Sequence, residues 1–310
     1  MSAYDHVSIG AGPGKQDRQE AQGKITMTAN DRDILGLEGK VALITGGGAG
    51  IGRATADMFA RAGMKLVIAE IDPARCATLR NAFPDHLILE ADVRRAADAG
   101  RIVSAIADRH GQLDVLMNNV GDFLRIQNYF VDTTEEDWDQ LYQVNLLHMF
   151  RMTKAALPLM KASGAGGSII NVSTIEAFRG IPKTVVYSAF KAAITGFTQS
   201  LAVELGQDGI RVNAIAPETT DTAQITADSR VPPSNRDYVS RWFPIGRFGK
   251  GQDSAGAALY LASERLSGWT TGHTILVDGG ALAAGAWMRL PDGKNWTHLP
   301  IIVADGYTPT

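Results

Sequence analysis

The sequence predicts an α/β protein whose single domain is built on a doubly wound, seven-stranded parallel sheet. Short apolar runs alternate with helical patterns along the chain, and one of these runs leads through a glycine-rich turn into a helical pattern. Apolar runs of this kind are typical of strands buried on both faces of a sheet, and their alternation with helices favours a parallel arrangement. The expected strands lie near residues 40–45, 65–69, 86–90, 113–117, 167–172, 209–215 and 273–277.

The domain is expected to cover residues 38–280 of the 310-residue chain, whose 45% hydrophobic content is enough for a large core. Residues 1–37 are rich in Gly, Asp, Gln and Lys without periodicity, which predicts a flexible leader. Residues 281–310 are expected to pack on the body or on a neighbouring subunit because they carry large apolar side chains. These are Trp287, Met288, Trp296, Leu299, Ile301 and Ile302.

The composition limits the binding partners and the cellular compartment that we expect for this protein. A net charge of −3 offers no basic footprint for nucleic acid or an anionic membrane. The single cysteine, Cys76, excludes an intramolecular disulfide framework and suits a reducing compartment. We expect a cytoplasmic protein, since the sequence has no run of about 18 apolar residues and no signal-peptide layout. The six histidines are scattered, and we expect no metal site.

The first expected strand enters a glycine turn at residues 45–52, and a helical pattern follows at 53–62. Glycines in such a turn let the backbone approach a pyrophosphate, whose charge the helix N-terminus stabilises. The turn residues expected to bind a dinucleotide are Gly46, Gly48, Gly50, Ile51 and Gly52. A second glycine cluster, at 10–14, has no helical pattern after it and is interpreted as part of the leader.

The second expected strand, 65–69, ends at Glu70, within the roughly 20-residue reach where such folds place a ribose-binding acid. A carboxylate there accepts hydrogen bonds from the adenosine ribose hydroxyls and repels a 2′-phosphate, so the predicted cofactor is NAD. Asp72 is the alternative acid if the strand is longer. Asp72 followed by Pro73 is also a good helix N-cap.

Several further motifs follow in order: Asp92-Val93, Asn118-Asn119-Val120-Gly121, Asn145, the segment 171–174, Tyr187-(x)3-Lys191, and Pro217 with Thr222. Together with the glycine turn, they resemble the short-chain dehydrogenase/reductase family over roughly residues 38–280. The resemblance implies a Rossmann fold and an oxidoreductase that uses a nicotinamide cofactor.

Tyr187 is the only one of seven tyrosines with a lysine four residues later. On a helix that spacing places Tyr187 and Lys191 on one face. A phenol is a poor base at neutral pH unless a nearby cation stabilises its phenolate, which Lys191 can do. The alternative for such a pair is a solvated helix face.

The family resemblance implies roles for these residues. Tyr187 is expected to be the general acid/base, Lys191 to lower its pKa and hold the nicotinamide ribose, and Asn145 to anchor a water in a proton relay. Taken alone, Asn145 is better interpreted as an amide paired to backbone, and Asp92 could also cap a turn. The resemblance adds to the cofactor-binding set Asp92, Val93, Asn119, Gly121, Pro217, Thr220 and Thr222.

Three positions depart from the family pattern. The catalytic serine of the family lies 13 residues before the tyrosine, where this chain has Thr174; a threonine hydroxyl can also polarise a carbonyl, and Ser173 is the fallback. Val120 replaces the usual alanine beside the nicotinamide. Glu218 replaces the usual glycine and places a carboxylate near the expected substrate mouth.

Residues 218–248 correspond to the substrate lid of the family. Its aromatic residues Trp242 and Phe243 either face a substrate or anchor the loop to the core. Glu176 either touches a substrate hydroxyl or faces water. Aromatic and apolar residues at the active end of the sheet indicate an apolar substrate larger than a short alcohol; they are Phe123, Ile175 and Phe178.

We therefore expect an NAD-dependent oxidoreductase that interconverts a secondary alcohol and a ketone, running as an alcohol dehydrogenase on an apolar cyclic or extended substrate. One alternative is a 3-oxoacyl-thioester reductase, and another is a protein that binds NAD without turnover. A cis-dihydrodiol and a steroid or terpenoid alcohol remain open as substrates. Family resemblance also implies a homo-tetramer joined through the helices near 134–160 and 186–206 and through the last strand.

Overall fold

The computed structural model describes residues 33–222, 225–226, 231, 236, 239–285, 288–290 and 296–297. Met1–Ile34 and Leu35–Thr310 are separate units, and the fold below is that of the second. Residues 1–32 of the expected leader 1–37 lie outside the described residues, whereas Leu37, at its end, is 2% exposed and packs in the core of the second unit.

The second unit contains a seven-stranded sheet in the order β3-β2-β1-β4-β5-β6-β9, and all neighbouring strands are parallel. The doubly wound Rossmann fold is therefore confirmed, with every strand boundary within two residues of its expected position. The strands are β1 (Val41–Thr45), β2 (Lys65–Glu70), β3 (Leu87–Glu90), β4 (Val115–Asn118), β5 (Gly167–Val172), β6 (Ile210–Pro217) and β9 (Thr274–Val277).

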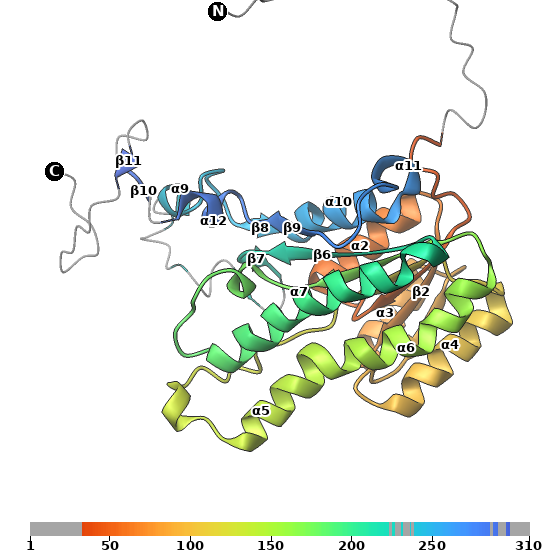
Figure 1. Cartoon of the computed structure of the whole chain (residues 1–310), viewed down its shortest axis with the longest axis horizontal. Helices are drawn as coiled ribbons and strands as arrows, with labels where there is room; N and C mark the ends of the chain where they lie inside the picture. The colour runs from red at the N-terminus through yellow and green to blue at the C-terminus, as the bar shows by residue number, and fades with distance from the viewer. Residues whose placement is uncertain are drawn as a thin grey trace, which may run out of the picture. The chain divides into compact units, whose positions relative to one another are not determined.

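Helices connect these strands and cover the sheet (Figure 1). The main helices are α2 (Gly50–Arg61), α3 (Pro73–Ala82), α4 (Ala96–His110), α5 (Glu135–Tyr142), α6 (His148–Ala162), α7 (Val185–Leu205) and α10 (Gly251–Ala262). Shorter elements are η1 (Phe130–Asp132), η2 (Gln143–Leu147), η3 (Ile175–Ala177), η4 (Gly206–Asp208), β7 (Thr220–Asp221), α9 (Val239–Trp242), β8 (Gly249–Lys250), α11 (Glu264–Ser267), α12 (Ala281–Ala284), β10 (Met288–Arg289) and β11 (Trp296–Thr297).

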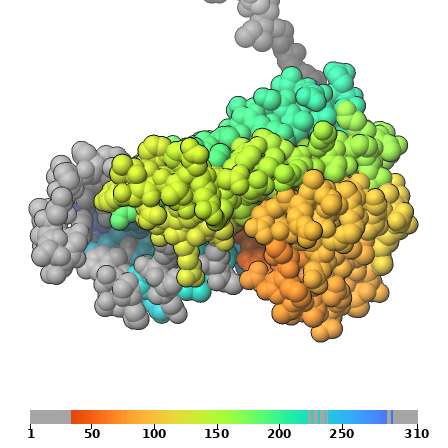
Figure 2. All heavy atoms as spheres, turned by 90° about the horizontal axis from the view of Figure 1, so that it is seen from below, coloured from red at the N-terminus to blue at the C-terminus, as the bar shows by residue number. Residues whose placement is uncertain are grey.

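Alternate residues of each strand face two different apolar layers, as the pleat of a sheet requires. Along β1, Ala42 and Ile44 pack with α2, α3 and α10, whereas Val41 and Leu43 pack with α4, α6 and α7. Both layers consist largely of fully buried aliphatic side chains. Figure 2 shows the outer surface of the second layer, where the golden atoms of α4 lie beside the yellow-green atoms of α6.

Buried polar side chains hold α6 and α7 to the carboxyl ends of β4 and β5. Asn118 and Asn171 are register partners, and the Asn118 amide donates to Asn171 Oδ1 at 3.0 Å and to Thr153 Oγ1 on α6 at 3.1 Å. Asn171 in turn donates to Thr198 Oγ1 on α7 at 3.0 Å. Because buried polar groups need partners, this network sets the positions of two helices around one edge of the sheet.

The described part of the C-terminal extension contacts the loop after α9, where Arg289 donates to the Pro244 carbonyl at 3.0 Å. Trp287, Leu299, Ile301 and Ile302, on which the packing prediction partly rests, lie outside the described residues. Among the described helices, none has the length and apolar character needed to cross a membrane.

Candidate active site

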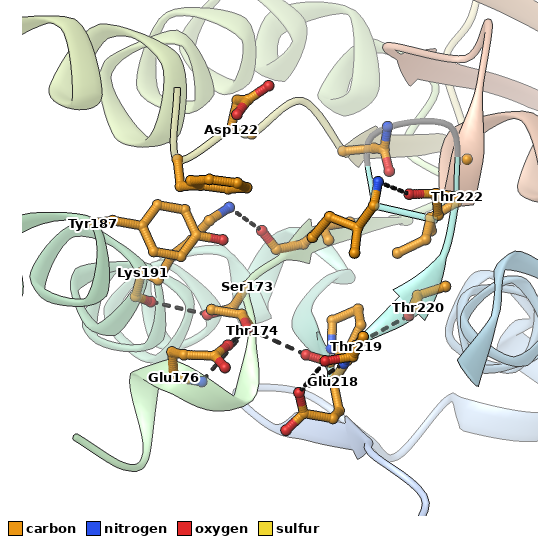
Figure 3. Close-up of a pocket in the computed structure, with 18 of the residues that line it drawn as sticks. Asp122, Ser173, Thr174, Glu176, Tyr187, Lys191, Glu218, Thr219, Thr220 and Thr222 are labelled. Atoms are coloured by element: carbon orange, nitrogen blue, oxygen red, sulfur yellow. Dashed lines mark hydrogen bonds between the residues drawn. The ribbon is translucent and has the colours of Figure 1, made fainter. Parts of the chain in front are cut away.

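A cavity of about 1030 Å³ lies at the carboxyl ends of the strands. It is lined from the ends of β1, β2, β4, β5 and β6, from α7 and from the segment before and within α9 (Figure 3). The predicted residues that line it are Gly46, Gly50, Ile51, Glu70, Asn119, Gly121, Ser173, Thr174, Tyr187, Lys191, Pro217, Thr220 and Thr222.

The glycine turn is tightly folded against the mouth of this cavity. Gly46 has a positive φ of 66°, and a Cβ on Gly52 would lie 2.2 Å from the Gly46 carbonyl oxygen, so neither position accepts a side chain. Ala49 caps α2 without a side-chain hydrogen bond. The first N–H groups of α2 are therefore available to an anion beside Gly50 and Ile51, which line the cavity.

Glu70 ends β2 beneath this turn and is 3% exposed. Its carboxylate accepts from the backbone N–H groups of Gly48 at 2.8 Å, Ile71 at 2.9 Å and Asp72 at 3.1 Å. A Cβ on Gly48 would lie 2.4 Å from Glu70 Oε2, so Gly48 shapes the turn from behind the lining. A carboxylate offers about four acceptor sites, so these three hydrogen bonds leave Glu70 with capacity to accept one more.

Asp72 is the N-cap of α3, as the second interpretation of its sequence context predicted. Its Oδ1 accepts from the Ala74 N–H at 2.8 Å and from the Arg75 N–H at 3.2 Å. Sequence reasoning missed Arg75, which also lines the cavity next to Glu70. The position of Arg75 in the first turn of α3 could have indicated this contact, because that turn faces the glycine turn.

Asp92 and Val93 follow β3 but do not line the cavity. The Asp92 carboxylate pairs with Arg94 at 2.8 Å, and this hydrogen-bonded cation lowers its pKa. Their assignment to cofactor binding stays a prediction.

The loop after β4 contacts both the glycine turn and α7. Asn119 Nδ2 donates to the carbonyls of Thr45 at 2.9 Å and Gly46 at 3.1 Å. A Cβ on Gly121 would lie 2.5 Å from Lys191 Nζ, so a side chain here would require the lysine ammonium to move.

Asn145 lies in η2, a π-helical turn that interrupts the helix between α5 and α6. Its amide donates to the carbonyls of Asp122 at 2.7 Å and Leu141 at 3.0 Å, and its Oδ1 accepts from the Asp122 N–H at 3.1 Å. The side chain is thus paired to backbone, and π-helical turns often occur at functional sites. Its predicted role in a water relay is not tested by these contacts.

Tyr187 and Lys191 lie one turn apart on α7, with the Lys191 ammonium 5.7 Å from the centre of the Tyr187 ring. Burial lowers the pKa of Lys191 to about 8, and Lys191 Nζ donates to the Val172 carbonyl at 3.2 Å. Burial is the largest cause that raises the pKa of Tyr187, followed by the charges of Glu176 and Asp122. Phe123 packs edge-on against the Tyr187 ring at 6.5 Å.

Ser173 and Thr174 have different partners. The Ser173 hydroxyl donates to the Lys191 carbonyl at 2.9 Å and so ties the end of β5 to α7. The Thr174 hydroxyl bonds to the Glu176 carboxylate and to the Pro217 carbonyl at 3.2 Å, on the cavity side. This arrangement favours Thr174 as the hydroxyl that meets a substrate.

A charged cluster lies beside Thr174. Arg179 donates to Glu176 Oε1 at 3.2 Å and to the Glu218 carboxylate. Glu218 Oε1 also accepts from the N–H and the hydroxyl of Thr219, at 2.7 and 2.8 Å. Sequence reasoning named each carboxylate but missed Arg179, because its pairing with Glu218 joins residues 39 positions apart.

The remaining predicted residues come from the chain after β6. Pro217 meets Thr174 through its carbonyl, and Thr220 donates to the Glu218 carbonyl at 2.8 Å. Thr222 lies against Gly50, where a Cβ would be 3.3 Å from Thr222 Cγ2. This segment therefore reaches from the charged cluster to the glycine turn.

The two aromatics of the expected lid differ in burial, although both line the cavity. Phe243 is 4% exposed and also packs with Ile175 and Ala216 in a small core, whereas Trp242 is 58% exposed. Phe178 is 42% exposed and does not line the cavity. Three further lid residues, Pro232, Pro233 and Tyr238, lie outside the described residues.

Comparison with known proteins identifies the class. A family model described as enoyl-(acyl carrier protein) reductase matches residues 46–281. The chain belongs to the short-chain dehydrogenase/reductase family, which binds a nicotinamide cofactor, and its relatives are oxidoreductases that act on CH–OH groups.

Individual relatives differ in activity. The chain is 36% identical to the 3-oxoacyl-(acyl-carrier-protein) reductase FabG of Thermotoga maritima, over 79% of this chain and 98% of that protein. It is also 36% identical to a sorbitol dehydrogenase of Cereibacter sphaeroides, again over 79% of this chain and 98% of the relative. Among solved structures, ElxO with NADP bound is similar with a TM-score of 0.73 at 29% identity, covering 79% of this chain and 99% of that one.

The residues of this cavity fit a nicotinamide dinucleotide. The glycine turn and the open N-terminus of α2 offer backbone donors to a pyrophosphate, Glu70 offers a carboxylate to a ribose, and Lys191 offers an ammonium group beside Tyr187. When bound, the cofactor supplies the hydride donor or acceptor.

Proposed function

We propose that this protein is an NAD-dependent dehydrogenase that interconverts a secondary alcohol and a ketone. The observation that carries the proposal is the pairing of Tyr187 with Lys191 on α7, in the same cavity as the glycine turn and Glu70. We assign the activity to residues 38–280, with residues 218–248 as the substrate lid.

In the oxidative direction, the alcohol hydroxyl binds between Tyr187 and Thr174, and Tyr187 takes its proton; a bound cofactor would accept the hydride from the carbinol carbon. Lys191, buried and cationic below its pKa of about 8, stabilises the phenolate that must form. Asn145 holds the Asp122 loop beside Lys191 and, in the proposed relay, anchors a water. In the reductive direction Thr174 polarises the carbonyl and Tyr187 returns the proton.

The proposed preference for NAD rests on Glu70. Its buried carboxylate lies where the adenosine ribose is expected and would repel a 2′-phosphate. Arg75 lies beside it but is 3.6 Å from Asp72, so part of its charge is already neutralised. The similarity to ElxO, solved with NADP, makes the choice of cofactor the first matter to measure.

Several side chains that line the cavity are apolar, which supports a cyclic or extended substrate body. They include Phe123, Ile181, Val239, Trp242 and Phe248. The similarity to FabG and the matching family model favour a second candidate, a 3-oxoacyl-thioester reductase. The similarity to a sorbitol dehydrogenase favours an alcohol.

The test is NADH or NADPH formation, followed by absorbance, across cyclic, aromatic, steroid and 3-hydroxyacyl alcohols. Tyr187→Phe is expected to lower turnover about 10³-fold, because it removes the group that exchanges the proton, while NAD still binds. Tyr260→Phe is the matched control, since Tyr260 lies on α10 outside the cavity. Unchanged turnover in Tyr187→Phe would overturn the mechanism, and NAD binding without turnover on any alcohol would favour a binding protein.

We further infer a cytoplasmic homo-tetramer joined through the α5–α6 helix, α7 and β9. Apolar side chains on two of these surfaces support it: Val203 on α7 is 84% exposed, Leu276 on β9 is 40% exposed, and Trp269 before β9 is fully exposed. Light scattering measures the assembly, and Val203→Glu with Trp269→Glu is expected to dissociate it.

A further inference from the structure

The charged cluster of Glu176, Arg179 and Glu218 shares the cavity with Tyr187 and Thr174. Figure 3 shows the Glu176 side chain reaching Thr174 on the Tyr187 side of the cavity, with Glu218 on the strand β6 side. The Thr174 hydroxyl contacts the Glu176 carboxylate directly. A substrate group that binds Glu176 would therefore lie next to the substrate atom that binds Thr174.

The cluster is acidic and largely removed from water. The side chains of Glu176 and Glu218 are 13% and 8% exposed, and one guanidinium, Arg179, lies between them. Two carboxylates against one cation leave one negative charge. Such a charge is costly to bury unless hydrogen-bond donors surround it.

Glu176 still has capacity to accept. Among the described residues its Oε1 accepts from Arg179 and its Oε2 from Thr174, whereas a carboxylate offers about four acceptor sites. Glu218 is more fully used, because Arg179 and both donors of Thr219 bond to it. The open acceptor positions at the reacting end of the cavity thus belong mainly to Glu176.

We propose that the substrate is a neutral vicinal diol, whose reacting hydroxyl binds Tyr187 and Thr174 and whose neighbouring hydroxyl donates a hydrogen bond to Glu176. This inference rests on the proposed alcohol dehydrogenase activity and specifies its substrate class. The apolar side chains that line the cavity, such as Phe123, then contact the carbon body of the diol.

Other substrate chemistries fit this cluster less well. A simple apolar alcohol would displace water from the Glu176 carboxylate without replacing its hydrogen bonds, which costs free energy. A carboxylate or phosphate beside the reacting carbon would meet the excess negative charge of Glu176 and Glu218. A vicinal diol in its gauche form places its two oxygens at hydrogen-bond distance from each other, which matches the contact between Thr174 and Glu176.

The electrostatics of Tyr187 agree with this geometry. Glu176 is the charged group that contributes most to the raised pKa of Tyr187, and both residues line the same cavity. A hydroxyl that donates to Glu176 weakens the field of this carboxylate at the phenol. The bound diol would thereby ease the deprotonation of Tyr187 that its own oxidation requires.

The test compares kcat/KM, with NAD, for cyclohexanol, cis- and trans-cyclohexane-1,2-diol, 2-aminocyclohexanol and 2-hydroxycyclohexanecarboxylate. The expected result is a preference for a diol over cyclohexanol of about 10-fold or more, since a site built to bind a hydroxyl rejects the analogue that lacks it. Glu176→Leu, which leaves no acceptor at this position, is expected to reduce this ratio about 10-fold, and Glu176→Gln, which keeps one acceptor oxygen, is expected to reduce it less. Glu204→Gln, an exposed carboxylate on α7, is expected to keep the wild-type ratio.

Equal use of cyclohexanol and both diols, or a diol preference that persists in Glu176→Leu, would overturn the inference. A stronger preference for the amino alcohol or the hydroxy acid would replace the diol by a cationic or an anionic substrate. The proposed function fails separately, if no alcohol is oxidised. In that case titration of the NADH complex with cyclohexanol and the diols still decides the inference, because equal affinities would refute it.

Discussion

The two sides of the cavity are built from different parts of the chain. On the glycine-turn side, the contacts are mostly to backbone: Glu70 accepts three N–H groups, and Asn119 donates to two carbonyls. On the substrate side, charged side chains contact one another, as Arg179 does with Glu176 and Glu218. Backbone contacts depend on the fold, whereas side-chain contacts can change with each substitution.

Two of the three departures from the family pattern follow this difference, whereas the third, Val120, lies against Gly46 on the glycine-turn side. The glycine turn keeps the expected residues, because Gly46, Gly48 and Gly52 have no room for a side chain. Thr174 and Glu218 are departures, and both lie on the substrate side, where the Thr174 hydroxyl and the Glu218 carbonyl and carboxylate meet neighbouring polar groups. In the proposed function, the glycine-turn side therefore binds the cofactor, and the side with Thr174 and Glu218 determines which substrate is used.

Among the variants that distinguish the contributions of the two sides of the cavity, Thr174→Ala is expected to have the largest effect. It removes a hydroxyl that binds the reacting oxygen, so kcat should fall about 10²-fold, while the dissociation constant of NAD stays within about threefold. Steady-state kinetics and NADH fluorescence titration measure the two quantities.

The neighbouring hydroxyl is the matched control. Ser173→Ala removes the bond to the Lys191 carbonyl and is expected to lower the free energy of unfolding by about 1 kcal/mol, with kcat within about threefold. Thr174→Ser should keep most of the activity, since it retains the hydroxyl. A large loss of kcat in Ser173→Ala, with Thr174→Ala active, would reverse the assignment.

A smaller effect is expected on the cofactor side. Glu70→Gln keeps an acceptor for the backbone but removes the charge that repels a 2′-phosphate, so the NADP/NAD ratio of kcat/KM should rise about 10-fold. Glu90→Gln, the exposed register partner of Glu70 on β3, should leave the ratio unchanged. A wild-type preference for NADP would contradict the role of Glu70 and direct attention to Arg75.

Local patterns in the sequence predicted the sheet, the glycine turn and the spacing of Tyr187 and Lys191, because each depends on residues close together along the chain. The pairing of Asn145 with the Asp122 backbone, and the position of Arg75 beside Glu70, depend on how loops are placed by the fold. The Arg179–Glu218 pair depends on two loops meeting across β5 and β6. Periodicity carries no information about contacts of this kind.

The smallest expected effect is a shift in the pH dependence of kcat/KM. This shift follows from a change in the pKa of Tyr187. The charges that face this phenol are Lys191 on its own helix, Glu176 on η3 and Asp122 after β4. The two carboxylates disfavour the phenolate and raise the pKa of Tyr187, whereas the Lys191 cation favours the phenolate. Oxidation of an alcohol needs the phenolate, so its rate rises as pH increases through that pKa.

Glu176→Gln removes one of the two negative charges, and the pKa of Tyr187 should fall. The rising limb of kcat/KM against pH is then expected to move to lower pH by roughly half a unit, which is about a threefold gain in rate on the acid side of the limb. Glu204→Gln should leave the limb in place. A shift to higher pH would mean that Glu176 assists the proton transfer rather than opposing it, and would make the substrate side a direct participant in the chemistry.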